Sequence, residues 1–196
     1  MARRLLDGFT KMHGKFGFIT AAIVAVVAIT PGPAAAEIAV GEKIPAGFKV
    51  VDPSGKVRNW ASVAGKKGTV LVFFRSAKWC PYCQAQLKSL KDLQAPLGQR
   101  GYSLAALSYD PPSTLAAFAT KTGVSYPLLS DEKSTMIDAF GLRDTSYASG
   151  SYAYGVPKAS ILVIDAKGIM RWKSVATDYK IRADNMTILQ AVDTLR

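Results

Sequence analysis

The stretch that decides the fold is residues 69–83, TVLVFFRSAKWCPYC. It opens with six consecutive β-branched, aliphatic or aromatic residues, 69–74, the pattern of a strand that is buried on both faces of a sheet. Pro81 follows soon after and favours the first position of a helix, because the N–H that proline lacks is one that a helix start leaves unpaired. A buried strand that leads into a helix start is typical of an α/β fold.

Cys80 and Cys83 stand at this junction and are the only two cysteines of the chain. If the helix begins at Pro81, Cys80 is its N-cap, and its sulfur faces unpaired N–H groups and the positive end of the helix dipole. That environment favours thiolate over thiol, and Lys78 and Arg75 are the nearby cations that would lower the thiol pKa further. We therefore predict that Cys80 is the exposed nucleophile and that Cys83, one turn inside the helix, is the resolving thiol.

Other uses of the cysteine pair are weaker. One CxxC supplies two zinc ligands, and the single histidine of the chain, His13, lies near the N-terminus. Haem attachment needs a histidine directly after the second cysteine, where this chain has Gln84. A bridge between residues so close removes little entropy from the unfolded chain. The favoured interpretation is a redox-active disulfide with no metal and no organic cofactor; a purely structural bridge is the alternative.

The N-terminus predicts a secretory signal peptide over residues 1–36. Four basic residues precede the uncharged, apolar run 18–29, and Pro-Gly-Pro at 31–33 breaks this run before three alanines. The pattern favours cleavage after Ala36. An uncleaved anchor is the alternative, although twelve apolar residues fall short of the roughly 20 that a spanning helix needs. Either way the domain is exported, to the periplasm or the medium, where disulfides persist; we expect membrane contact only if the segment stays uncleaved.

Removal of that segment would leave one domain, residues 37–196, without a histidine. This excludes a Ser/His/Asp triad, a Cys/His pair and a His-ligated metal. The whole chain carries a net charge of +11, and residues 37–196 retain 21 basic and 13 acidic side chains. Because export removes nucleic acid as a partner and the lysines are scattered, we interpret the excess charge as a solvated surface. A hydrophobic fraction of 49% excludes a disordered chain.

The rest of the chain alternates between strand and helix patterns. Strands are expected at 48–51, 57–60, 69–74, 103–108, 160–164 and 169–175, and helices at 81–95, 113–122, 134–140 and 184–195. Turn residues at 52–55 and 165–168 predict two hairpins, and Pro96 is expected to end the helix that follows the motif. This order predicts a central mixed β-sheet flanked by helices, with an N-terminal β-hairpin extension.

Several side chains are expected around the cysteine pair. If the strands ending at Phe74 and Ser108 are parallel, their carboxyl ends open at the same sheet edge, which puts Tyr109 and Asp110 beside the motif. A turn or N-cap role is the alternative for Asp110. Trp79 suits a docking face, or else only packs against its neighbours.

The motif Trp79-Cys80-Pro81-Tyr82-Cys83 after a buried strand resembles the thioredoxin superfamily, and glutaredoxins share its Pro-Tyr dipeptide. More of the chain is similar to the alkyl hydroperoxide reductase/thiol-specific antioxidant family, the peroxiredoxin-like redoxins. The similar stretches are 40–45 with Phe48, 55–57, 71–75, 108–110, 126–131, 140–141 and 163–168. The resemblance covers nearly all of residues 37–196. It implies a thioredoxin-like fold, reduction of peroxides or protein disulfides, and an electron-donating thiol protein as partner.

Some positions depart from the peroxiredoxin pattern. That family carries Thr or Ser three residues before the peroxidatic cysteine and Pro seven residues before it, where this chain has Ala77 and Phe73. Ser76 is one place off. The arginine that the family places ahead of the strand ending at Asp165 aligns with Ala159.

A second loop is expected to approach the motif. Thioredoxins place a cis-proline near this point, for which Pro157, preceded by Val156, is the candidate; an ordinary trans proline is the alternative. The segment 147–154 carries three tyrosines among small residues and is expected to line a substrate groove or to be a solvated insertion.

Three functions follow from these observations. The first is an antioxidant enzyme that reduces peroxides through a Cys80 sulfenate resolved by Cys83. The second is a protein thiol–disulfide reductase that resembles the membrane-tethered cytochrome-maturation thioredoxins. The third, a metal or copper chaperone, is disfavoured by the missing histidine. We therefore predict a thiol–disulfide oxidoreductase of cell redox homeostasis.

Overall fold

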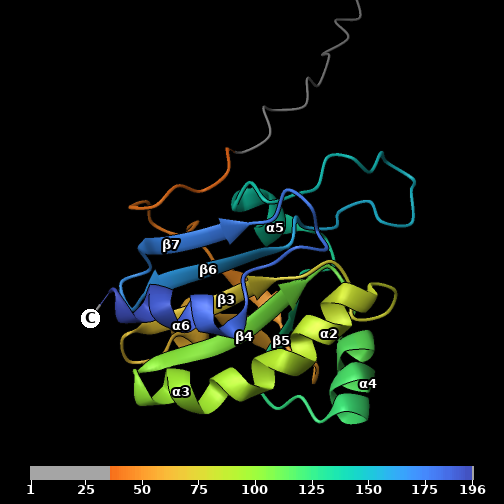
Figure 1. Cartoon of the computed structure of the whole chain (residues 1–196). Coiled ribbons are helices and arrows are strands. Elements are labelled where there is room, and N and C mark those ends of the chain that lie inside the picture. Colours follow the sequence, from red (N-terminus) through yellow and green to blue (C-terminus); the bar gives the residue numbers. More distant parts are fainter. Residues whose placement is uncertain (1–35, 196) are drawn as a thin grey trace, which may run out of the picture. The chain divides into compact units, whose positions relative to one another are not determined.

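The computed structural model describes residues 36–195, which contain one seven-stranded sheet with the strand order β2-β1-β5-β4-β3-β6-β7 (Figure 1). The strands are β1 (Lys49–Val51), β2 (Val57–Asn59), β3 (Gly68–Phe73), β4 (Tyr102–Ser108), β5 (Leu128–Ser130), β6 (Ser160–Asp165) and β7 (Met170–Val175). The helices are α1 (Trp60–Val63), α2 (Pro81–Ser89), α3 (Gln94–Gln99), α4 (Pro112–Thr122), α5 (Thr135–Ala139) and α6 (Asn185–Asp193), with a 3₁₀ helix η1 (Leu90–Leu93) between α2 and α3.

Strand β3 lies at the centre of this sheet, and all six of its residues are buried. It pairs with β4 in parallel and with β6 in antiparallel orientation along its whole length. The predicted mixed sheet is therefore confirmed, as is the N-terminal hairpin, in which β1 pairs with β2 and extends the sheet through β5. Because β3 and β4 are parallel, their carboxyl ends meet at one edge.

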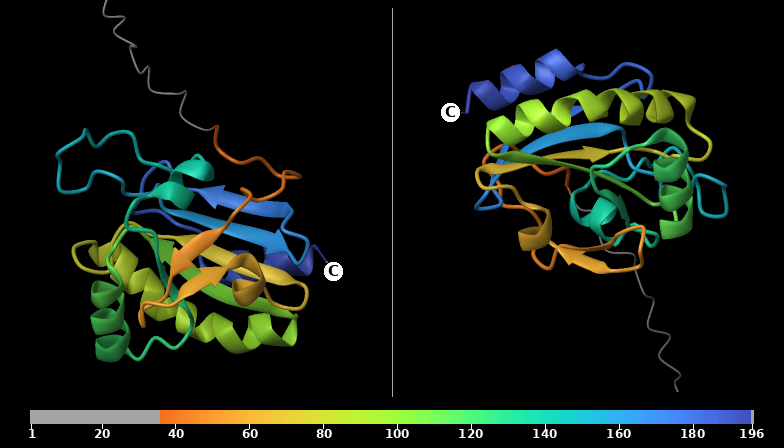
Figure 2. Two further views of the ribbon diagram at one scale, coloured as in Figure 1. Left: turned by 180° about the vertical axis from the view of Figure 1, so that it is seen from behind. Right: turned by 90° about the horizontal axis from the view of Figure 1, so that it is seen from below.

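Two apolar layers cover the faces of the sheet. On one face, alternate residues of β3, Val70 and Val72, join a buried cluster with Leu87 of α2, Leu97 of α3 and Ile188 of α6. The residues between them face the other way and form a second cluster with α1, α5 and the N-terminal segment before β1. Figure 2 shows α2, α3 and α6 side by side over the first face. This alternation is what a strand buried on both sides requires.

The helix after the motif differs from its prediction. It is not one helix over 81–95: α2 ends at Ser89, a 3₁₀ turn follows, and α3 begins at Gln94. Pro96 does not end the helix but lies in the first turn of α3. A proline is tolerated there because the first N–H groups of a helix have no partner within that helix.

Two further elements were not predicted. Trp60, expected at the end of a strand, begins α1, since Asn59 caps that helix through reciprocal hydrogen bonds with Ser62. Strand β5 is only three residues long, too short for its periodicity to identify it. The predicted signal peptide lies outside the described residues except for Ala36. Within residues 36–195, no helix is both long and apolar enough to cross a membrane.

The turn between β1 and β2 yields a pH-dependent prediction. Asp52 accepts hydrogen bonds from Ser54 and Lys56 and pairs with Arg58 at 2.8 Å. The Ser54 hydroxyl contributes most to lowering the pKa of Asp52 from 3.8 to about 2. A lowered carboxyl pKa stabilises the fold at pH values above the unfolded pKa, and this stabilisation is lost as pH falls toward the folded value. We expect Asp52→Asn to lower the free energy of unfolding by about 1–2 kcal/mol at pH 7.

The difference in the free energy of unfolding between the wild type and Asp52→Asn should shrink as the pH falls from 4 to 3. Urea titrations of both proteins measure this difference. The exposed Asp92→Asn is the control, with little change at either pH. A deficit for Asp52→Asn that stays constant with pH would contradict the assignment.

Candidate functional site

The Cys80–Cys83 pair lies at the carboxyl edge of β3, at the start of α2. Cys80 is the N-cap of this helix and Pro81 is its first residue, as the sequence predicts. The two cysteines form a disulfide with their Cα atoms 5.2 Å apart. The backbone N–H of Cys83 donates to Cys80 Sγ at 3.3 Å. A thiolate on Cys80 would accept the same bond, which favours its charged form.

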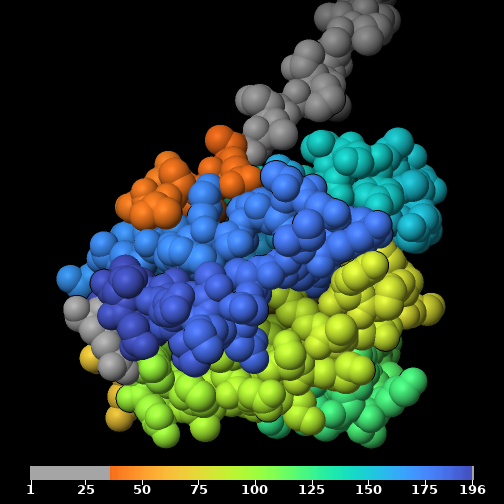
Figure 3. Space-filling model, viewed as in Figure 1, coloured from red at the N-terminus to blue at the C-terminus, as the bar shows by residue number. Residues whose placement is uncertain are grey.

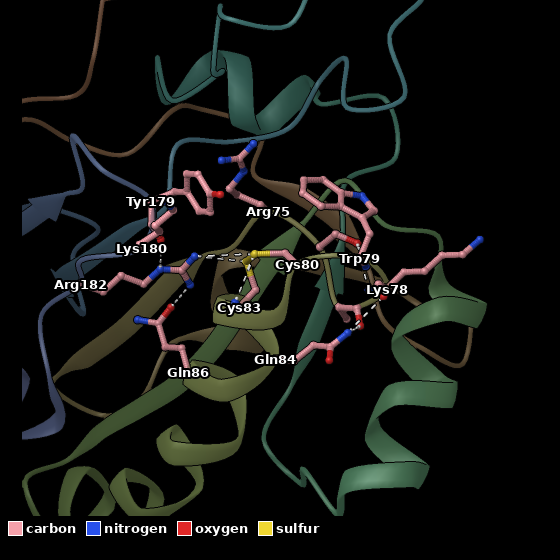
Figure 4. Close-up of a disulfide and its surroundings, with 12 residues drawn as sticks. Arg75, Lys78, Trp79, Cys80, Cys83, Gln84, Gln86, Tyr179, Lys180 and Arg182 are labelled. Atoms are coloured by element: carbon pink, nitrogen blue, oxygen red, sulfur yellow. Dashed lines mark hydrogen bonds between the residues drawn. A yellow bond between two sulfur atoms is a disulfide. The ribbon is translucent and has the colours of Figure 1, made fainter.

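Both cysteines are covered in this disulfide form. Cys80 is 1% exposed and Cys83 is fully buried, so the prediction of an exposed Cys80 is wrong for this state. The cover comes from the segment between β7 and α6, which carries Tyr179 and Arg182 (Figure 4). Figure 3 shows this blue segment lying against the yellow stretch around the motif. Cys80 must therefore become more accessible before a large substrate can reach its sulfur.

Arg182 is the cation that contacts the disulfide. Its Nη2 lies 3.2 Å from Cys83 Sγ and 3.9 Å from Cys80 Sγ. The other nitrogens hold the guanidinium in place: Nε donates to the carbonyl of Tyr179 at 2.8 Å, and Nη1 donates to Gln86 Oε1 at 2.6 Å. Burial lowers the pKa of Arg182 to about 10, and the charge of Arg75 acts in the same direction. Among residues 36–195 no carboxylate forms an ion pair with this guanidinium, so a thiolate in the reduced protein would supply the opposite charge.

Arg182 was missed by the sequence analysis. It stands 102 positions after Cys80, in a segment without strand or helix periodicity. Proximity along the chain offered Lys78 and Arg75 as the only cations near the motif. No sequence signal marks Arg182, because the folding of α6 against α2 and η1 brings its segment to the sulfurs.

Arg75 is buried in an aromatic cage and points away from the sulfurs (Figure 4). The centre of its guanidinium lies 5.4 Å from the ring of Trp79, 5.1 Å from that of Tyr147 and 4.2 Å from that of Tyr179. Its Nη2 also donates to the hydroxyl of Tyr147. These rings stabilise the cation, and Arg75 contacts the motif through Trp79.

Lys78 is exposed and extends away from the disulfide (Figure 4). It lines a groove of about 450 Å³ between α2 and α4 together with Lys88 and Lys121. An exposed cation is screened by solvent and salt.

We therefore expect Lys78→Ala to raise the pKa of the Cys80 thiol by less than about 0.5. Iodoacetamide alkylation rates of the reduced protein, measured across pH, give this value. A rise as large as about 1.5 would show that Lys78 turns toward the sulfur in the reduced form.

Asp110 organises the loop that leads into the motif. Its two carboxylate oxygens accept from Ser76 Oγ at 2.8 Å and from the backbone N–H of Ala77 at 2.6 Å. Burial raises the pKa of Asp110, and these two donors oppose the rise. Ser76 Oγ also accepts from the backbone N–H of Lys78. The hydroxyl that stands one place off the peroxiredoxin pattern is thus engaged in holding the loop.

The aromatic residues predicted near the pair lie on its two sides. Trp79 Nε1 donates to the hydroxyl of Tyr109 at 3.0 Å, and the Trp79 ring packs edge-on against Tyr152 at 5.4 Å. Burial raises the pKa of Tyr109. On the other side, Tyr82 is 45% exposed and packs against Tyr179 with ring centroids 5.8 Å apart. The loop 147–154 therefore reaches the motif through Tyr152, while Tyr147 contacts Arg75 just before the motif.

Pro157 is trans, since no cis peptide bond occurs in the described part of the chain. It forms an isolated backbone bridge with Arg143, and Val156 before it is fully buried. The cis-proline that thioredoxins carry is therefore not present at this position.

A metal site is not formed by the described residues: nowhere between 36 and 195 do three His, Cys, Asp or Glu side chains gather. Two sulfurs beside a guanidinium at a helix N-terminus support thiol–disulfide chemistry.

A family model described as the AhpC/TSA family matches residues 40–173. The chain belongs to the AhpC/TSA family. Peroxiredoxin Bcp of Escherichia coli is 31% identical over 133 residues, covering 68% of this chain and 82% of that protein. A putative peroxiredoxin of Mycobacterium tuberculosis is 30% identical over 143 residues, covering 73% and 86%. The enzyme class predicted from the sequence, a thiol oxidoreductase, is confirmed.

Solved structures show the same fold as this AhpC/TSA chain. Peroxidoxin BcpB of Mycobacterium tuberculosis superposes with a TM-score of 0.69 at 24% identity, covering 80% of this chain and 97% of that one. Thiol peroxidase from Chromobacterium violaceum gives a TM-score of 0.66 at 19% identity, covering 83% and 89%. The thioredoxin-like, peroxiredoxin-type fold expected from the resemblance is thereby confirmed.

Two of the three departures from the peroxiredoxin pattern, Ala77 and Ala159, lie at this site. Ala77 has no hydroxyl to offer, and its backbone is held by Asp110. Ala159, which aligns with the arginine of the pattern, is buried and lines a small cavity together with Arg182 and Gln86. This AhpC/TSA chain thus has a guanidinium beside that position, supplied from a different segment.

Proposed function

We propose that this protein reduces peroxides through a Cys80–Cys83 dithiol cycle. The observation that carries the proposal is the guanidinium of Arg182 beside a disulfide whose first sulfur caps a helix. Arg182 and the helix N-terminus both favour a thiolate, which is the attacking form of a cysteine. Family membership and the peroxiredoxin relatives support a peroxide as the substrate class.

The proposed cycle has three steps. The Cys80 thiolate attacks one oxygen of the peroxide, the O–O bond breaks, and the leaving oxygen takes up a proton to form an alcohol or water. The Cys83 thiol then attacks the sulfur of the Cys80 sulfenic acid, which forms the disulfide and releases water. A dithiol protein finally returns two electrons and two protons by exchange with the disulfide. In this cycle the protein needs no organic cofactor and no metal.

A second candidate, reduction of protein disulfides, is favoured by one observation. Ala77 and Ala159 replace the hydroxyl and the arginine of the peroxiredoxin pattern, and Ser76 is engaged with Asp110. Exchange with a disulfide needs the attacking thiolate and its resolving partner but not that hydroxyl.

Stopped-flow oxidation of the reduced protein separates the two candidates. Hydrogen peroxide should oxidise it far faster than it oxidises free cysteine, with one disulfide formed per chain, and insulin disulfides should react more slowly. Peroxide oxidation no faster than that of free cysteine, together with rapid reduction of insulin, would establish the second candidate instead.

We also propose that the protein is exported, on the strength of the basic, apolar and Ala-rich pattern of residues 1–36. Cell fractionation and N-terminal sequencing test this. A mature chain that begins at Glu37, in the periplasm or the medium, is the expected result. An intact Met1 in the membrane fraction would identify an anchor, and an intact chain in the cytoplasm would overturn export.

A further inference from the structure

A cavity of about 720 Å³ lies beside Arg75 and Tyr179, both of which line it. Its walls come from the end of β7, from the loop that precedes β6, and from Arg75 at the end of β3. Its charged and aromatic lining consists of Glu37, Arg75, Asp144, Tyr147, Lys158 and Tyr179. The remaining lining side chains are short, and half of them are polar. The cavity is large enough for a small organic molecule.

Arg75 is the uncompensated charge of this cavity. It is 3% exposed, and within residues 36–195 no carboxylate lies at ion-pair distance from it. Its Nε is buried and donates to no described group. The aromatic cage and the Tyr147 hydroxyl are its partners. An ionised group buried without a counter-charge is unfavourable, so an anion that enters the cavity would gain a strong interaction.

The two acids that line the cavity are already engaged. Glu37 pairs with Lys173 at 2.7 Å and with Lys158 at 3.6 Å. Asp144 Oδ1 accepts from the backbone N–H of Ser146 at 3.0 Å. Neither acid compensates Arg75, because Glu37 is shared by two lysines and Asp144 is bound to a backbone N–H. The lining holds two acidic and two basic side chains, and Arg75 is the one of the two basic side chains that has no ion pair among the described residues. Arg75 is therefore the group in this cavity that favours an anionic ligand.

We propose that this cavity binds the carboxylate of an organic substrate to Arg75. Guanidinium groups match carboxylates in geometry, and the rings of Tyr147 and Tyr179 offer apolar surface to the body of such a molecule.

The position of the cavity extends the proposal to the reaction, and this extension rests on the proposed function. Tyr179 packs on the guanidinium of Arg75 and also against Tyr82, the residue between the cysteines. A molecule whose carboxylate is held by Arg75 thus lies against a ring that also contacts the motif. The substrate class is an organic disulfide or hydroperoxide that carries a carboxylate.

Benzoate is the probe for binding, measured on the oxidised protein by tryptophan fluorescence, since Trp79 contacts Arg75. We expect saturable binding, with a dissociation constant that rises about tenfold or more in Arg75→Met. Arg171→Met is the matched control: it removes the same charge from an exposed arginine that pairs with Asp165 outside the cavity lining, and its binding should equal that of the wild type. Lys158→Met, at the partly exposed rim, should weaken binding about threefold.

Lys158→Met keeps the test decisive if Arg75→Met does not fold. An absence of saturable benzoate binding in the wild type would overturn the site. Equal weakening by Lys158→Met and Arg171→Met would also overturn it, because general attraction by net charge would then explain the binding.

The substrate class is tested with two aromatic disulfides, the carboxylate-bearing 5,5′-dithiobis(2-nitrobenzoate) and the neutral 2,2′-dithiodipyridine. The ratio of their rates with the reduced protein should fall about tenfold in Arg75→Met and stay constant in Arg171→Met. A change in thiol pKa affects both rates alike and cancels in this ratio. An unchanged ratio in Arg75→Met would overturn the substrate assignment. Wild-type rates no higher than those of Cys80→Ser would contradict the proposed function instead, while the benzoate titration still decides the site.

Discussion

Replacing Cys80 by serine is expected to abolish peroxide reduction and disulfide exchange. Cys83, the only other thiol, lies within the first turn of α2 and lacks the N-cap position that stabilises a thiolate. A serine hydroxyl keeps the size of the side chain and the hydrogen bond from the Cys83 N–H, so the fold should be unaffected. Stopped-flow oxidation and unfolding curves of the variant, compared with the wild type, measure both effects.

The matched variant, Cys83→Ser, should retain the first attack and lose the resolving step. Its first oxidation by peroxide should proceed at close to the wild-type rate, and in the presence of the donor protein it should accumulate a mixed disulfide through Cys80. Mass spectrometry identifies the sulfur involved. If instead Cys83→Ser failed in the first attack and Cys80→Ser retained it, the roles of the two cysteines would be reversed.

Arg182→Gln is expected to raise the pKa of the attacking thiol by about 1.5. A guanidinium within 4 Å of both sulfurs stabilises a thiolate more than it stabilises a neutral disulfide, so its loss also disfavours the reduced form. The reduction potential should fall by roughly 30 mV for each tenfold change in that equilibrium. Arg182→Lys keeps the charge but not the two bonds that orient it, and should restore part of both effects.

Alkylation rates across pH give the thiol pKa, and thiol titration in redox buffers gives the potential. Arg171→Gln, which removes an exposed arginine remote from the motif, controls for net charge and should change neither value. An Arg182→Gln protein with the thiol pKa and the potential of the wild type would show that Arg182 only covers the disulfide.

Those parts of the fold and site that depend on residues close together in the sequence were predictable. The apolar run 69–74 is stable only as a strand that is buried inside a sheet. Pro81 favours the first position of a helix, which makes Cys80 the N-cap. The placement of Tyr109 and Asp110 near the motif follows from parallel strands that end at one edge. These inferences need only local periodicity and the rules of α/β topology.

Features that depend on tertiary packing were not predictable. The approach of Arg182 and the burial of Cys80 are set by how the segment after β7 folds back, and no local pattern encodes that path. The direction of Lys78 is set by the loop that Asp110 holds through Ser76 and Ala77, so a cation close in sequence to the sulfur points elsewhere. The prediction that Pro96 ends a helix is wrong because a new helix, α3, begins after the 3₁₀ turn and has Pro96 in its first turn.

The spacing of the cysteines bears on how the proposed cycle withstands excess oxidant. A sulfenate that waits for its partner is open to a second peroxide, which converts it irreversibly to a sulfinate. Here the resolving sulfur is one helical turn away and needs no partial unfolding of α2 to reach its target. Ring closure therefore competes at high effective concentration with the bimolecular side reaction. The enzyme should survive many turnovers at peroxide concentrations that inactivate a sulfenate left without a neighbouring thiol.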